Sequence, residues 1–286
     1  VISYGAGLDG RVHRLDMHNY RTMGFEKGHH EDAVKTVNYC HDTDRVFSGS
    51  WDKTMMVWDA KTGSSTGKID LPDKVYSCDL KGNYLLIAMA NRHVHLHDTR
   101  RIDVPLQRRE SSLKYQTRSI RLSPTLKGFV ITSVEGRVGV EYIDPSEQEQ
   151  AKKYAFKCHR EPAAGPTPAD PPCELVYPVN AVCFHPVNKD TFATGGADGV
   201  VAMWDAVNRK RIKQLTPKYP SSIASLDFSP SGQYLAIASS YGFEQGEREY
   251  SISCLVLVYF FTNTHTNPYV VMNRTQSLFT RSTHLM

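Results

Sequence analysis

Short stretches of alternating apolar and polar residues recur along this chain, separated by tight-turn residues. In each unit the turn residue stands seven positions before a position that is usually Asp; the turn residues are Asp9, Asp52, Asn91, Glu135 and Asp198. Alternation over about five to eight residues, bounded by Gly, Ser and Asp, predicts β-strands. Most units are about 40–45 residues apart, with one longer step before Asp198, and a sixth turn is expected at Tyr241-Gly242. The pattern predicts an all-β propeller of about six four-stranded units.

The second unit is the clearest, with expected strands at 34–39, 45–50 and 54–59 around a turn at 51–53. One set of residues has the spacing of the hydrogen-bonded tetrad that fastens a blade together: His30, Ser48, Asp52 and Trp58. Thr194, Asp198 and Trp204 repeat part of this set. Buried polar groups must find partners, so a structural role is favoured over a catalytic one.

Two segments interrupt the period. The prolines of residues 161–174 are expected to prevent strand pairing, which predicts an exposed loop between blades. The hydrophobic run 251–261 is too short to span a bilayer and is predicted to be a closing strand. The propeller is therefore assigned to residues 1–261 and a frayed tail to 262–286. Val1 lies within an expected strand, which suggests that sequence upstream is missing.

Composition narrows the possible functions. The chain has 286 residues, 40% of them apolar and 22% charged, which is enough for a packed core. A net charge of +4 gives no general attraction to nucleic acid. The six cysteines form no C-x-x-C pair and are expected to be reduced, buried thiols of an intracellular protein.

Blade topology predicts which side chains share a face. The turn between a blade's second and third strands, the entry to its first strand and the end of its fourth strand all lie on one face. Trp51, Arg118, Arg137 and Lys157 occupy such positions. The cations are either solvated surface charges, contributing about 0–1 kcal/mol each, or an anion clamp for an acidic or phosphorylated peptide. Charge alone leaves both interpretations open.

Aromatic residues at two turns are candidate contacts for a partner. Trp51 fills a turn position that holds Leu8 or Ala197 in other units, and Tyr241 fills it in the sixth. A tight turn does not require an indole, so an exposed Trp beside cations is a plausible anchor. Packing of the ring within the blade is the alternative for both residues.

Other candidate sites are weak. His93, His95 and His97 share one face of a strand, but no fourth ligand is evident and we expect no metal. Arg209-Lys210-Arg211 is a basic run in an expected loop, either a solvated turn or a nuclear-import signal. No nucleophile, base or Gly-rich phosphate loop stands out, so neither an enzyme nor a cofactor is expected.

Five strings of the sequence resemble a known family. They are residues 107–118 (QRRESSLKYQTR), 135–138 (EGRV), 153–160 (KYAFKCHR), 177–181 (YPVNA) and 223–226 (IASL). These strings are similar to the mitotic checkpoint WD-repeat proteins of the budding-uninhibited-by-benzimidazole group. The resemblance runs from about Gly5 to Glu247 and is looser before Val75.

The resemblance implies a seven-bladed propeller in the nucleus and, during mitosis, at the kinetochore. Its implied partners are the GLEBS motif of checkpoint kinases and pseudokinases and the phosphorylated MELT repeats of the kinetochore scaffold. In that family the positions matching Arg118, Arg137 and Lys157 contact glutamate or phosphothreonine, and the position matching Trp51 lines the same face. No membrane partner is implied, and direct nucleic-acid binding is not expected.

The chain also departs from this family. The family has a further blade upstream of Val1, and one of its two face tryptophans belongs to that blade. Its last strand does not resemble residues 252–286, so we expect an open ring or strained ends. The sister family of mRNA-export WD-repeat factors shares Phe156 to Arg160 and also binds GLEBS peptides; it is the alternative assignment. An RNA-binding propeller would show a larger basic field with exposed aromatics.

Overall fold

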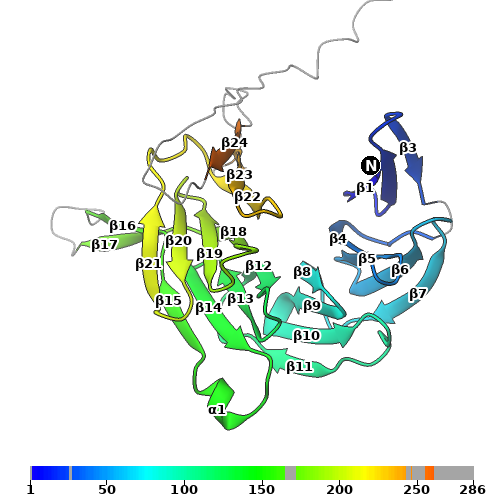
Figure 1. The fold of residues 1–286 in the computed structure, drawn as a ribbon, viewed down its shortest axis with the longest axis horizontal. Helices are drawn as coiled ribbons and strands as arrows, with labels where there is room; N and C mark the ends of the chain where they lie inside the picture. Colours follow the sequence, from blue (N-terminus) through cyan, green and yellow to red (C-terminus); the bar gives the residue numbers. More distant parts are fainter. Residues whose placement is uncertain (1, 26–27, 165–171, 243–245, 247–254, 261–286) are drawn as a thin grey trace, which may run out of the picture.

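The computed structural model describes residues 2–25, 28–164, 172–242, 246 and 255–260. Almost all regular structure in these residues is antiparallel β-sheet, in successive sheets that fan out along an arc (Figure 1). Four sheets have four strands each, and the first and last sheets have three. Each sheet uses consecutive strands in chain order, which is the connectivity of propeller blades. The predicted fold class is confirmed.

The strand bounds follow the predicted units. The first sheet contains β1 (Ile2–Ala6), β2 (Val12–Asp16) and β3 (Arg21–Gly24). The next two contain β4 (Val34–Cys40), β5 (Arg45–Ser50), β6 (Thr54–Asp59), β7 (Ser65–Asp70), β8 (Val75–Lys81), β9 (Tyr84–Met89), β10 (His93–Asp98) and β11 (Gln107–Glu110). A 3-10 turn (Ala90–Arg92) joins β9 to β10.

The second half of the arc repeats this arrangement. Its four-stranded sheets contain β12 (Thr117–Leu122), β13 (Gly128–Ser133), β14 (Arg137–Tyr142), β15 (Tyr154–Lys157), β18 (Val179–Phe184), β19 (Thr191–Gly196), β20 (Val201–Asp205) and β21 (Lys210–Gln214). The last sheet contains β22 (Ile223–Phe228), β23 (Tyr234–Ser239) and β24 (Leu255–Phe260). The short helix α1 (Glu147–Gln150) precedes β15.

The core is divided into layers between successive blades. Leu85 and Ile87 of β9 pack toward the blade that contains Phe47, whereas Leu86 and Ala88 pack toward the blade that contains Phe129. Successive side chains of a strand point to opposite faces, so each blade contributes to the core on both sides. Strands such as β9 are therefore apolar throughout, and the hydrophobic layers hold the blades in order.

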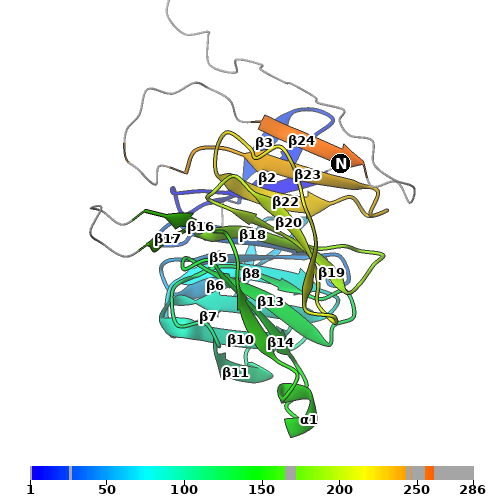
Figure 2. The same ribbon diagram turned by 90° about the vertical axis from the view of Figure 1, so that its left-hand side faces the viewer.

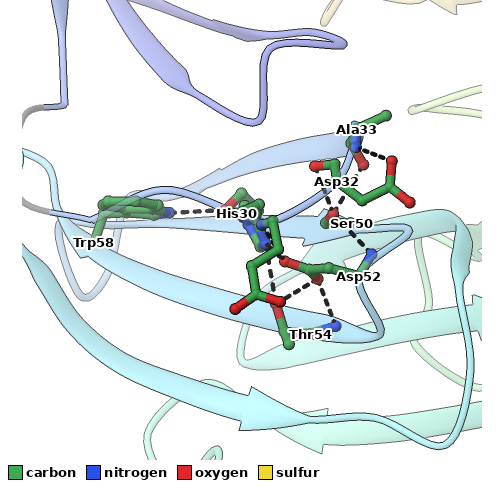
Figure 3. A network of polar contacts seen from close by, with 9 residues as sticks. His30, Asp32, Ala33, Ser50, Asp52, Thr54 and Trp58 are labelled. Atoms are coloured by element: carbon green, nitrogen blue, oxygen red, sulfur yellow. Dashed lines mark hydrogen bonds and ion pairs between the residues drawn. The ribbon is translucent and has the colours of Figure 1, made fainter.

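The predicted tetrad fastens the second blade. The Trp58 indole donates to Ser48 Oγ at 2.8 Å, and His30 Nε2 lies 2.7 Å from the same hydroxyl. His30 Nδ1 lies 3.0 Å from Asp52 Oδ2, and Asp52 accepts from the Thr54 amide and hydroxyl (Figure 3). A second tetrad joins Trp204, Thr194, His159 and Asp198 at 2.9–3.0 Å. The sequence analysis had not assigned His159 to it.

The two ends of the arc lie apart. The first sheet and the last sheet are separated in Figure 1, and in the described residues β24 pairs with β23 alone. The strand predicted in 251–261 forms, but it does not close the ring within this part of the chain. The expected tail at 262–286 lies outside the described residues.

The prediction of an unpaired loop over residues 161–174 is wrong at both ends of that segment. Strand β16 (Arg160–Ala163) pairs with β17 (Cys173–Val176), and Pro162 stands opposite Glu174. A two-stranded ribbon leaves one edge of each strand free, so proline is tolerated where its missing N–H would face outward. The hairpin projects from the blades in Figure 2. Residues 165–171 lie outside the described residues.

Three smaller predictions also require correction. The expected tight turn at Tyr241-Gly242 is a longer connection, because β23 ends at Ser239 and β24 begins at Leu255. Cys173 is exposed, whereas Cys40, Cys78, Cys158 and Cys183 are buried as expected. Cys173 opens β17 of the projecting hairpin, and its thiol donates to Ala164 O at 3.3 Å. Lys210 and Arg211 belong to strand β21 and not to a loop.

Candidate functional site

The four predicted face residues lie at the same end of their strands. Trp51 is in the β5–β6 turn, where its amide donates to Ala33 O at 3.0 Å. Arg118 is at the start of β12, and Arg137 opens β14 directly opposite Lys157 at the end of β15. The topology therefore places them on one face, as the sequence predicted. Trp51 and Arg118 line one hollow of that face, Lys157 lines another, and Arg137 stands opposite Lys157 on the neighbouring strand.

The first hollow, the mouth hollow, has a volume of about 300 Å³ and opens where the innermost strands begin. Its lining includes Trp51, Arg118, Lys35, Tyr76, Asn180 and Ala224, and among the residues that the structure describes it contains no Asp or Glu. The indole and one cation of the predicted clamp thus share a surface that carries no negative side chain within the described parts of the chain.

A repeated backbone irregularity builds this lining. The pairing register shifts at the second residue of every inner strand from β4 to β22, which leaves that residue without a partner on the next strand. The residues in question are Lys35, Tyr76, Arg118, Asn180 and Ala224. A β-bulge turns a side chain away from the normal alternation. Five successive bulges therefore present five side chains to one mouth.

Asn180 holds Arg118 in place. Its side-chain oxygen accepts from Arg118 Nε at 3.1 Å, and its amide nitrogen donates to Ser222 Oγ at 2.9 Å. This chain of contacts crosses three inner strands, from β12 through β18 to β22. One edge of the guanidinium is thus fixed while the group remains exposed.

Trp51 is presented beside further positive charge. Its residue is 38% exposed, and Lys74 Nζ lies 5.7 Å from the indole ring centroid. An ammonium over an indole face is attracted by the ring quadrupole. Packing within the blade does not account for an indole that is this open to solvent.

The other two predicted cations have acidic neighbours. Arg137 Nε lies 3.3 Å from Glu135 Oε1, without the alignment of a hydrogen bond. Lys157 Nζ lies 3.9 Å from Glu174 Oε2, which also accepts from Arg160 Nη1 at 2.9 Å. The Arg160 hydrogen bond and, after it, the charge of Lys157 lower the pKa of Glu174. These two cations are partly neutralised within the chain.

Lys157 lines the second hollow, the outer hollow, of about 350 Å³. This hollow lies against the β16–β17 hairpin and includes Arg160, Glu174 and Arg211. His159 and Asp198 of the second tetrad also line this hollow, and each is 7% exposed. The hollow therefore mixes both signs of charge, unlike the mouth hollow.

Tyr241 follows β23, and its hydroxyl donates to Gly246 O at 2.9 Å. Its neighbour Gly242 lines the mouth hollow. The structure thus places the predicted Tyr241 contact beside the mouth, with its hydroxyl already engaged by the chain.

Two histidines of β10, His95 and His97, are buried in the blade. His97 Nδ1 donates to Ile102 O at 2.8 Å, and burial lowers the pKa of His97. Burial, with nearby positive charge, also lowers the pKa of His95 to about 4. The described residues contain no group of three or more His, Cys, Asp or Glu that could hold a metal ion. They also include no helix long and apolar enough to cross a membrane.

The basic run lies at the outer edge of its blade. Lys210 and Arg211 are exposed on β21, the edge strand. Arg209 stacks over the Tyr154 ring at 4.7 Å and donates to Lys152 O at 3.2 Å. Part of the run is therefore used to join neighbouring blades.

Sequence reasoning missed Lys35, Tyr76 and Asn180 as parts of the site. The available signal was their shared position, because each follows the first apolar residue of an inner strand. Strict alternation gives no sign of a bulge, so the pattern alone did not single them out.

Comparison with known proteins identifies the family. The sequence pattern described as "WD domain, G-beta repeat" matches residues 21–59 and 174–205. The mitotic checkpoint protein BUB3.1 of Arabidopsis thaliana is 47% identical over 252 residues, which are 86% of this chain and 70% of that protein. The chain belongs to the BUB3 family. The mitotic checkpoint protein bub3 of Dictyostelium discoideum is 45% identical over 85% of this chain and 72% of that protein.

Two further matches are a protein named as an mRNA export factor and a solved structure. The mRNA export factor GLE2 of Chaetomium thermophilum is 32% identical, over 86% of this chain and 66% of that protein. A chain from a crystal structure of a mitotic checkpoint complex aligns with a TM-score of 0.71, covering 94% of this chain and 73% of that one. Its sequence identity is 13%, so this match supports the fold.

Proposed function

We propose that this BUB3-family chain is a non-enzymatic scaffold of the mitotic spindle checkpoint that binds acidic or phosphorylated peptide segments on the face containing Trp51. The observation that carries the proposal is that Trp51 and Arg118 line one hollow to which the described residues contribute no carboxylate. An indole supplies apolar contact area, and a guanidinium supplies charge-assisted hydrogen bonds. Arg137 and Lys157 lie on the same face, each beside an acid of the chain, Glu135 and Glu174 respectively.

The proposed ligands are the GLEBS segment of a checkpoint kinase or pseudokinase and phosphorylated MELT repeats of the kinetochore scaffold. Support comes from the family resemblance and from the checkpoint proteins among the relatives. A role at the kinetochore, and in the nucleus between divisions, follows from these partners. The Arg209–Arg211 segment is the proposed nuclear-import signal.

Peptide titration followed by fluorescence anisotropy tests the proposal. Labelled GLEBS and phosphorylated MELT peptides should bind, and Arg118→Glu or Arg137→Glu should abolish capture while the circular dichroism melt stays unchanged. Lys127→Glu is the matched control, because Lys127 is exposed in the β12–β13 turn on the opposite face. Equal binding by all variants would refute the peptide-binding face.

A second candidate is a nuclear transport factor that binds a nucleoporin GLEBS segment and RNA. The 32% identity to GLE2 and the exposed basic strand β21 favour it. An RNA oligomer in the same titration separates the two functions. RNA binding that weakens steeply with salt, together with no phosphopeptide binding, would favour transport.

A further inference from the structure

A third hollow, the channel hollow, lies among the five inner strands and has a volume of about 340 Å³. It shares Lys35, Tyr76, Arg118 and Asn180 with the mouth hollow, so the two are continuous. Its lining comes from β4, β8, β12, β18 and β22 and is mostly polar. Of the described residues that line it, three are cationic and none is Asp or Glu.

The three cations are Lys35, Arg118 and Arg121. None of them has a carboxylate within 4.0 Å in the described part of the chain. Arg121 Nη1 donates to Ile120 O at 2.9 Å and to Cys78 O at 3.4 Å, so neutral carbonyls hold it. The positive charge of this lining is therefore not balanced by paired acids.

Two carboxylates lie beyond the lining on the same strands. Asp79 of β8 accepts from the Leu122 amide at 2.7 Å; burial raises its pKa, and the nearby charge of Arg121 acts in the opposite direction without forming an ion pair within 4.0 Å. Asp227 is exposed on β22. Each comes directly after the last residue of its strand that lines the channel hollow, Cys78 on β8 and Leu226 on β22. The part of the channel next to the mouth therefore stays positive.

We propose that the channel hollow binds a compact, free small molecule that carries several phosphate groups. Cations in a concave site with protein walls concentrate their field and attract anions. One guanidinium can donate two parallel hydrogen bonds to two oxygens of a phosphate, and an ammonium adds a compact positive charge. Lys35 lies on β4 and the arginines on β12, with β8 between them. A ligand that reaches all three needs more than one anionic group.

This site is distinct from peptide capture because Arg121 and Lys35 are not part of the proposed peptide clamp. Arg118 belongs to both hollows, so the two ligands compete for one guanidinium. A polyphosphorylated molecule in the channel is therefore expected to weaken the binding of an acidic peptide at the mouth.

Isothermal titration with inositol hexakisphosphate, tripolyphosphate and orthophosphate tests the proposal at about 0.15 M salt. The first two should bind saturably and orthophosphate at least tenfold more weakly, since one phosphate reaches fewer cations. Arg121→Gln should weaken the binding of inositol hexakisphosphate about tenfold, the expected loss of a charge-assisted contact. Arg121 also donates to backbone carbonyls, so its replacement could disturb the fold. Lys35 is exposed, and Lys35→Gln is therefore a second variant that should also weaken the binding of inositol hexakisphosphate.

Lys127→Gln is the matched control and should bind as the unaltered chain does. Citrate separates phosphate recognition from general anion attraction and should bind weakly. Absence of saturable binding, unchanged affinity in both Arg121→Gln and Lys35→Gln, or an equal loss in Lys127→Gln would overturn the proposal. The titrations contain no peptide, so their result is independent of the proposed peptide function.

Discussion

The Glu174 carboxylate lies 3.9 Å from the Lys157 ammonium, in the position that an acidic ligand of Lys157 would take. Glu174 belongs to the β16–β17 hairpin and is also bound by Arg160 at 2.9 Å. The hairpin thus places an acid of the chain's own in the outer hollow. A peptide that uses Lys157 must displace this carboxylate.

We therefore predict that Glu174→Gln strengthens acidic-peptide binding by about two- to fivefold, the range expected for removing one exposed competing charge. Glu149→Gln is the matched control, because Glu149 pairs with Lys152 in a similarly exposed ion pair away from the hollow. Fluorescence anisotropy at low and high salt measures the difference, which should shrink as salt rises. Unchanged affinity would show that Glu174 does not compete.

Trp51→Ala is expected to weaken peptide binding by about 30-fold, the usual effect of losing an aromatic hot spot of about 2 kcal/mol. The melting temperature should change little, because the indole is 38% exposed. Leu8→Ala is the matched control, since Leu8 fills the same turn position in the first sheet and is 87% exposed. A similar loss of affinity in both variants would argue against a specific indole contact.

Ser48→Ala should destabilise the fold without touching the binding face. It leaves His30 Nε2 and the Trp58 indole N–H buried without their shared partner. Unsatisfied buried groups cost about 1–3 kcal/mol each, so for two groups we expect a loss of about 2–6 kcal/mol in the free energy of unfolding. Urea unfolding measures it, with the exposed Ser3→Ala as control. A loss no larger than in the control would contradict the structural role of the tetrad.

The fold should lose stability as the pH falls from about 6.5 toward 4. The pKa of His95 is about 4 in the folded chain and 6.5 ordinarily, so in this range the unfolded chain binds more protons. His30 and His97 have pKa values lowered by burial and act in the same direction. Each group contributes at most about 1.4 kcal/mol per pH unit. The stabilisation that comes from these lowered histidine pKa values should be fully present above about pH 6.5.

Urea unfolding at several pH values checks this dependence. His95→Gln should make the slope of unfolding free energy against pH shallower, whatever its effect on stability at pH 7. The exposed His18→Gln should leave the slope unchanged. Equal slopes in the unaltered chain and His95→Gln would contradict the assignment.

Much of the blade architecture could be predicted from local sequence. The turn before each third strand and the spacing from His30 to Trp58 specify strand ends and one tetrad, because they reflect contacts within one blade. The place of His159 in a second tetrad was missed, because a projecting hairpin separates it in sequence from Thr194 and Asp198. The prolines of that hairpin were misjudged, since proline excludes pairing on one edge of a strand only.

The sequence by itself determined most of the blade strands and their order within blades, and it predicted one face for Trp51, Arg118, Arg137 and Lys157. These features follow from side-chain alternation and from the direction of successive strands. Only the tertiary structure decided which of these side chains line the same hollow and which lie beside an acidic side chain of the chain itself. That outcome depends on bulges at the inner strands and on contacts between blades, such as Arg118 with Asn180. Such contacts join residues far apart in sequence, so local patterns carry no record of them.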